Sequence, residues 1–123
     1  MDQENISEIV RFFFTLQLNL KIYHWNTTSY SRHKASDQLG GNLSTLVDKF
    51  VEVFIGKYKA KPVPRGIKIS DGFITDDGSI VLLEKARKYL EELNSKIKDT
   101  ELLNIRDELL SEINQTLYLY QLK

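Results

Sequence analysis

Both histidines of the chain and three of its carboxylates lie within one stretch, and four of these five residues recur at the spacing of a helix face. The five residues are His24, His33, Asp37, Asp48 and Glu52. The last four fall within roughly 100° of arc on a continuous helix. Imidazole nitrogen together with carboxylate oxygen suits Fe, Mn or Zn, whereas Ca and Mg prefer oxygen alone. The stretch is therefore a candidate metal site, and the alternative is an ordinary solvated helix face.

One helix cannot bring these side chains to a single metal ion. At about 1.5 Å per residue, His33 and Glu52 lie roughly 28 Å apart along the axis. The pairs His33/Asp37 and Asp48/Glu52 share a midpoint at residues 42–43. If two copies of the helix pack antiparallel about a two-fold axis there, His33 faces the partner's Glu52 and Asp37 faces the partner's Asp48. The spacing therefore predicts a homodimer with two identical sites, each built from both chains.

Length and composition limit the other classes of function. The chain has 123 residues, no cysteine, and 17 basic against 17 acidic residues. We expect one domain over residues 1–123, no disulfide, and no overall charge that favours nucleic acid. The acidic N-terminus does not resemble a signal peptide, and no apolar run approaches the ~20 residues of a membrane span. We expect a cytoplasmic protein with no membrane partner.

Helical periodicity predicts an all-α protein with four helices. The first begins near Asn5, with Glu8 completing a capping box. The others span about 32–57, 79–98 and 100–120. The apolar face of the second helix points away from the metal-site stripe, and it consists of Leu39, Leu43, Leu46, Val47, Phe50, Val53 and Phe54. Gly40, Gly41 and Ser44 lie on or beside the stripe, near its midpoint, where small side chains permit close approach of a second helix.

Residues 58–78 form an irregular crossover between the second and third helices. Prolines and glycines interrupt any helix there, and the short segments 67–69 and 73–74 are consistent with a small hairpin. Short loops join the first helix to the second and the third to the fourth. Two antiparallel pairs with one long crossover are the arrangement of a ferritin-like four-helix bundle.

The ligand spacings resemble those of the Dps group, the miniferritins of starved bacteria. The resemblance rests on His24-Trp25-Asn26, His33-x3-Asp37 and Asp48-x3-Glu52. It implies that His24, His33 and Asp37 bind metal from one subunit, that Asp48 and Glu52 come from its two-fold mate, and that Trp25 flanks the site. Small Dps-like proteins of viruses and phages also resemble this segment, and for such a relative the host cytoplasm or the virion is the expected location.

The resemblance implies a ferroxidase that binds Fe(II) and oxidises it with peroxide or O2, with Zn or Mn as other possible metals. Three departures limit what carries over. The interval from His24 to His33 is about three residues shorter than is typical of the family, the crossover has no counterpart of the family's short helix, and a lysine-rich tail is absent. A homodimer is expected, whereas a larger shell stays open.

Two other functions stay open on the sequence. The first is a catalytically inactive structural or interaction protein with the same bundle, with or without a structural metal. The second is nucleic-acid binding through the basic crossover, which carries Lys57, Lys59, Lys61, Arg65 and Lys68. Because the net charge is zero, we expect DNA binding to be weak or absent.

Overall fold

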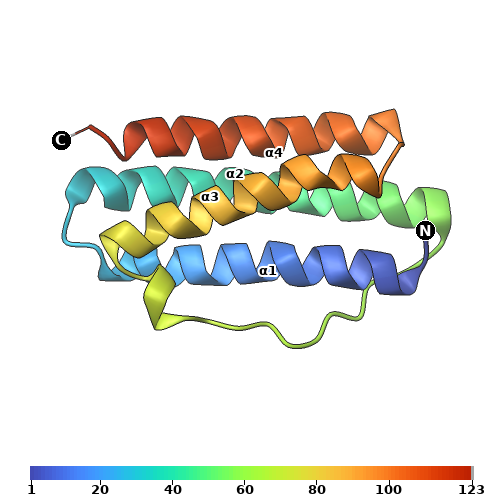
Figure 1. The fold of residues 1–123 in the computed structure, drawn as a ribbon, viewed down its shortest axis with the longest axis horizontal. Coiled ribbons are helices and arrows are strands. Elements are labelled where there is room, and N and C mark those ends of the chain that lie inside the picture. The colour runs from blue at the N-terminus through green and yellow to red at the C-terminus, as the bar shows by residue number, and fades with distance from the viewer. Residues whose placement is uncertain (123) are drawn as a thin grey trace.

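The computed structural model describes residues 1–122 and places four α-helices side by side (Figure 1). The helices are α1 (Gln3–Asn26), α2 (Tyr30–Tyr58), α3 (Asp76–Glu92) and α4 (Thr100–Leu119), with 3-10 turns at η1 (Asp71–Phe73) and η2 (Leu93–Ser95). No strand occurs in residues 1–122, so the all-α bundle is confirmed and the predicted hairpin is wrong. The chain instead closes a tight turn where Phe73 N–H donates to the Ser70 carbonyl oxygen.

Two helix starts differ from the sequence prediction because other side chains cap them. The α1 helix is capped by Asp2, whose side chain accepts a hydrogen bond from Asn5 N–H while the Asn5 side chain accepts one from Asp2 N–H. The α3 helix begins three residues before the predicted Ser79, because the Thr75 hydroxyl accepts a bond from Gly78 N–H. Both arrangements satisfy amide groups that the first turn of a helix leaves unpaired.

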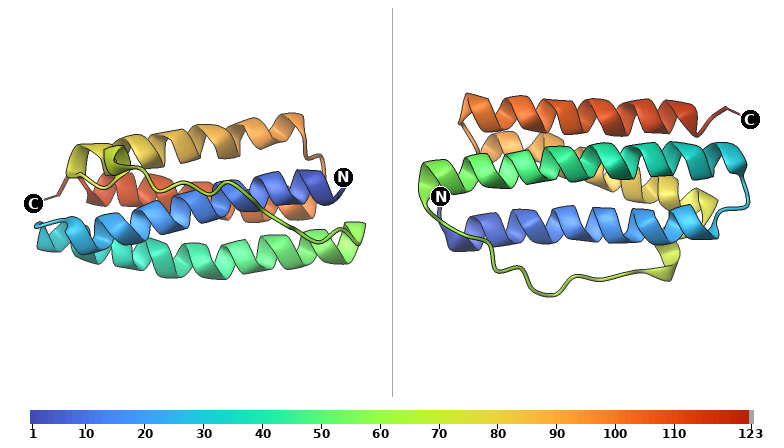
Figure 2. Two further views of the ribbon diagram at one scale, coloured as in Figure 1. Left: turned by 90° about the horizontal axis from the view of Figure 1, so that it is seen from below. Right: turned by 180° about the vertical axis from the view of Figure 1, so that it is seen from behind.

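The crossover sets the direction of the second helix pair. From Lys59, residues run in extended form along α1 to the opposite end of the bundle, where α3 begins (Figures 1 and 2). Two side chains of α1 bond the backbone of this crossover. The Ser7 hydroxyl accepts a hydrogen bond from Val63 N–H, and the buried Asn19 amide bonds the Lys68 carbonyl oxygen and Ser70 N–H. Consequently α2 and α3 run in the same direction, and each short loop joins an antiparallel pair.

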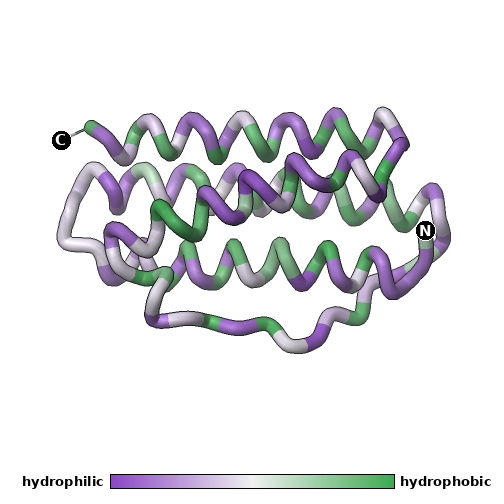
Figure 3. Tube along the Cα trace, in the orientation of Figure 1, coloured by the Kyte–Doolittle hydropathy of each residue, from purple (hydrophilic) through white to green (hydrophobic). Residues whose placement is uncertain are grey.

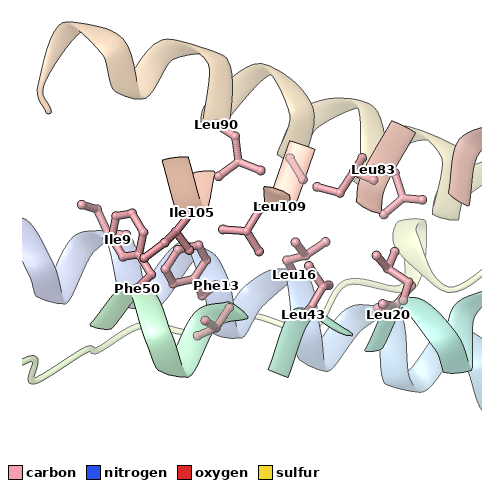
Figure 4. Close-up of a cluster of buried hydrophobic side chains, with 14 of the residues drawn as sticks. Ile9, Phe13, Leu16, Leu20, Leu43, Phe50, Leu83, Leu90, Ile105 and Leu109 are labelled. Carbon is pink, nitrogen blue, oxygen red and sulfur yellow. The ribbon is translucent and has the colours of Figure 1, made fainter. Parts of the chain in front are cut away.

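The apolar stripes of all four helices meet in the core. Figure 3 shows apolar and polar residues recurring along each helix, and Figure 4 shows Phe13, Phe50, Leu83 and Leu109 in the cluster between the helices. The Phe13 and Phe50 rings meet edge to face with centroids 5.4 Å apart. Full burial of each such side chain contributes about 1.5–3 kcal/mol. Across residues 1–122, no helix combines the length and apolar character needed to cross a bilayer.

The two faces of α2 divide as the periodicity predicted. Leu39, Leu43, Val47, Phe50 and Phe54 are buried in the core. The opposite side carries the candidate ligands and faces away from this core. The interior of the bundle therefore fixes the position of α2 without using any of the three acids of the candidate site.

Candidate metal centre

His24 and His33 lie against each other at the corner where α1 turns into α2. Their imidazole rings are stacked, with centroids 3.9 Å apart and planes inclined by 17°. The Nδ1 of His24 is 2.9 Å from the backbone carbonyl oxygen of His33, and the Nδ1 of His33 is 2.9 Å from that of His24. A carbonyl oxygen can only accept, so each Nδ1 carries a hydrogen, and whenever a ring is neutral its Nε2 lone pair is available to a metal. A bond of this kind orients metal-binding histidines in proteins generally.

Asp37 lies on the open side of this pair. Its Oδ1 is 3.8 Å from the Nε2 of His24, and its side chain is 61% exposed, whereas His24 is 7% exposed. Two donors about 2.1 Å from one ion lie at most about 4.2 Å apart, so His24 and Asp37 are close enough to share a metal. The shortened interval between the histidines therefore still places His24 next to both His33 and Asp37, although the three side chains do not converge on one point in the single chain.

Asp48 and Glu52 do not reach these residues within one chain. Both are exposed on α2, toward its C-terminal half. Within residues 1–122, no three histidine or carboxylate side chains converge on a point suitable for a metal ion. This separation agrees with the helix geometry. Asp48 and Glu52 could approach the histidines only from a second copy of the chain, as the predicted dimer requires.

A groove between α1 and α2 leads to the histidines. It encloses about 460 Å³ and is lined by Gln17, Leu18, Leu20, Lys21, His24, Ser36, Asp37, Gly40 and Gly41. A Cβ added at Gly40 or Gly41 would meet no atom within 4 Å, so packing inside this chain does not require glycine at either position. Glycine inside a helix costs about 1 kcal/mol relative to alanine. The two glycines leave the outer surface of α2 open to close approach.

Large apolar side chains are exposed along one side of α1, and one of them, Leu18, lines the groove. Phe14, Leu18 and Trp25 recur at helical intervals and are 39%, 44% and 65% exposed. Lys21 lies among them and places its Nζ 5.7 Å from the centre of the Trp25 ring. The apolar surface of α1 is therefore not confined to the side that faces the core. Its second apolar side is exposed in the single chain, beside the candidate ligands.

Asp76, the first residue of α3, joins both helix ends that carry the histidines. Its Oδ1 accepts hydrogen bonds from the Tyr23 hydroxyl at 2.7 Å and from the Thr27 hydroxyl at 2.9 Å. Its backbone carbonyl oxygen accepts one from Arg32 Nη1 at 3.0 Å. The Tyr23 hydrogen bond lowers the pKa of the Asp76 carboxyl, and burial raises the pKa of Tyr23.

The sequence prediction assigned no role to Asp76. It placed the start of the third helix at Ser79, which left Asp76 in the irregular crossover. The signal was present in Thr75-Asp76-Asp77, because threonine followed by acidic residues is typical of a helix N-terminus. A start at that point would have placed an aspartate where α3 meets the corner between α1 and α2.

Comparison with known proteins identifies the family. The profile of DUF5856, described as a family of unknown function, matches residues 24–120. The chain belongs to this family. The matched range includes all five predicted ligands and Asp76.

A curated relative comes from Enterobacteria phage T4 and is described as an uncharacterized 14.6 kDa protein in the mobD-ri intergenic region. The two sequences are 30% identical over 79 residues, which is 63% of this chain and 61% of the relative. The chain thus spans about three fifths of the relative's length. A phage relative fits the resemblance to phage proteins, and no solved structure matches significantly.

Proposed function

We propose that the protein is a Dps-like iron-binding protein that oxidises Fe(II) with peroxide or O2 at a site shared across a two-fold dimer. The observation that carries the proposal is the reciprocal pair of hydrogen bonds between His24 and His33. They hold both rings by Nδ1 and leave both Nε2 atoms available. A histidine that merely satisfies its polar atoms in a core would not need a second, stacked histidine held in the same way beside an exposed carboxylate.

The donor set suits iron as the substrate. His24, His33 and Asp37 would supply the nitrogen and oxygen ligands of one half, and the partner's Asp48 and the partner's Glu52 would supply the carboxylates of the other. Mixed nitrogen and oxygen ligands accept Fe(II), Mn(II) or Zn(II), and incomplete coordination leaves a position for an oxidant. The ligands position the metal, and the metal supplies the redox chemistry.

Three features support the two-fold dimer. Gly40 and Gly41 leave open space along α2, the exposed Phe14, Leu18 and Trp25 lie beside it, and the acids lie on the same side of the helix. Several large apolar side chains exposed along one side of a helix are consistent with an interaction site. The order of the helices and the long crossover also support the ferritin-like assignment. No feature of residues 1–122 favours a closed shell over a dimer.

Fe(II) binding and oxidation test the proposal. Under anaerobic conditions the wild-type protein should bind Fe(II), and addition of peroxide or O2 should then oxidise it faster than in buffer. His33→Ala and Asp48→Ala should both abolish this difference, because each removes one half of the same site. Lys49→Ala is the matched control, since it alters an exposed residue of α2 next to Asp48 and should keep full activity.

Two results would overturn the proposal. Oxidation at the rate seen in buffer would exclude a ferroxidase, and full activity of His33→Ala would exclude this site. Tightly held zinc in the purified protein, with no Fe(II) oxidation, would instead support the catalytically inactive alternative with a structural metal.

A further inference from the structure

Each histidine of the candidate centre directly follows a residue that Asp76 holds. Tyr23 precedes His24 and donates its hydroxyl hydrogen to the Asp76 carboxylate. Arg32 precedes His33 and donates to the Asp76 backbone carbonyl oxygen. Successive residues of a helix point about 100° apart. Tyr23 and Arg32 therefore face the start of α3, whereas His24 and His33 face each other.

Tyr120, which directly follows α4, reinforces the attachment of these two residues. Tyr23 is fully buried, and its ring lies 5.9 Å from that of Tyr120. The Arg32 guanidinium carbon lies 4.8 Å from the centre of the same Tyr120 ring. The Tyr120 hydroxyl in turn accepts a hydrogen bond from the buried Ser79 of α3 at 3.1 Å. Tyr23 and Arg32 thus both contact Asp76 and Tyr120.

The stacked histidines depend on the relative position of two helix ends. Their reciprocal hydrogen bonds link Nδ1 of one residue to the backbone of the other, so both bonds need the end of α1 and the start of α2 to stay in register. Only residues 27–29 join the two helices covalently. The Asp76 side chain bonds Tyr23 and Thr27 at the end of α1, and its backbone bonds Arg32 at the start of α2. Asp76 therefore attaches both helix ends to one point of α3.

We propose that Asp76 is a positioning residue of the metal centre, which acts through Tyr23 and Arg32 to hold His24 and His33 in their stacked, Nδ1-protonated arrangement. Its effect on metal affinity rests on the proposed function, whereas its effect on the histidine rings does not. Removal of the Asp76 side chain should release the end of α1. The histidine pair should then lose its fixed tautomer, and a metal would have to reorder the rings when it binds.

Nitrogen-detected NMR of the metal-free protein tests the effect on the rings. Two-bond proton–nitrogen spectra distinguish the two neutral tautomers of each imidazole, and the wild type should show only the tautomer with hydrogen on Nδ1 at both histidines. Asp76→Ala should give a mixture of tautomers. Asp76→Asn should restore the wild-type spectrum, because its amide oxygen still accepts from Tyr23 and Thr27. The matched control is Asp77→Ala, which removes the next carboxylate along α3 and should leave the spectrum unchanged.

Co(II) titration tests the effect on the metal. Asp76→Ala should weaken binding about tenfold, the lower range for residues that orient metal ligands indirectly. If Asp76→Ala does not fold, Tyr23→Phe removes one of the hydrogen bonds with the ring retained and should show a smaller change of the same kind. Unchanged histidine spectra in a folded Asp76→Ala or Tyr23→Phe would overturn the inference. Absence of Co(II) binding by the wild type would instead count against the proposed function alone.

Discussion

Each end of the bundle contains a hydrogen bond from a tyrosine hydroxyl to an aspartate, but the surroundings of the two bonds differ. At one end the Tyr23 hydroxyl donates to Asp76, the first residue of α3, at 2.7 Å. At the other the Tyr58 hydroxyl donates to Asp99, which precedes the first residue of α4, at 2.6 Å. Each bond therefore fixes the end of one helix to the start of a later one.

The surroundings of the two bonds differ. Lys57 Nζ lies 2.6 Å from Asp99 and 3.1 Å from Glu101, so one cation pairs with both carboxylates at the Tyr58 end. The hydrogen bond to Asp99, with a further one to Glu101, raises the pKa of Lys57, and the bond from Lys57 lowers the pKa of Asp99. In this group each charged side chain already has a partner of opposite charge. The Tyr23 bond, like the Tyr58 bond, is only partly buried, but the histidines beside it use Nδ1 for hydrogen bonds and leave Nε2 for a ligand.

Replacement of the two tyrosines by alanine should give the largest difference between the ends. Tyr23→Ala removes a fully buried ring and should lower the free energy of unfolding by about 3–5 kcal/mol. Tyr58→Ala removes a partly exposed ring and should lower it much less. Urea unfolding followed by circular dichroism measures both. Equal losses would show that burial does not distinguish the two ends.

The effects of acid and salt on stability should be smaller. Acid should affect both ends in the same way, and salt should distinguish them. The pKa values of Asp76 and Asp99 are both lowered in the folded protein, from an ordinary value of 3.8. Each carboxylate therefore stabilises the fold above that value, and this stabilisation is lost as the pH falls through the lowered pKa. Asp76→Asn and Asp99→Asn should each make the loss of stability between pH 7 and pH 3 less steep than in the wild type.

Salt should separate the two variants. About 1 M NaCl reduces the Debye length to about 3 Å and screens exposed ion pairs. At pH 7 it should therefore diminish the difference between the wild type and Asp99→Asn, whose partner is Lys57, and leave the difference for Asp76→Asn unchanged. Urea midpoints at low and high salt provide the measurement. A salt-sensitive Asp76→Asn difference would mean that charge, and not the Tyr23 hydrogen bond, dominates at that end.

The sequence predicted the parts of the molecule that depend on periodicity. The core face of α2 at Leu43 and Phe50, the exposure of Asp48 and Glu52, and the long crossover all follow from spacing and from the positions of prolines and glycines. Apolar residues that recur every three or four positions leave few alternatives for which side of a helix is buried.

Features that depend on contacts distant in sequence were not predictable in this way. Asp76 meets Tyr23 across 53 positions, and no local pattern links the two. The buried Asn19 resembles an ordinary polar position of a helix until its bonds to the crossover are known. For the histidines, the family resemblance implied that they belong to one site, whereas their stacking depends on how residues 27–29 fold.

The most direct test of the shared metal site is complementation between two inactive variants. One variant, His33→Ala/Asp37→Ala, keeps Asp48 and Glu52, and the other, Asp48→Ala/Glu52→Ala, keeps the histidine half. When the two are unfolded together and refolded in equal amounts, half of the dimers should be mixed, and each of these should have one intact site. We predict Fe(II) binding and oxidation at about a quarter of the wild-type level. A mixture as inactive as its two components, with mixed dimers detected by native mass spectrometry, would contradict a site built from both chains.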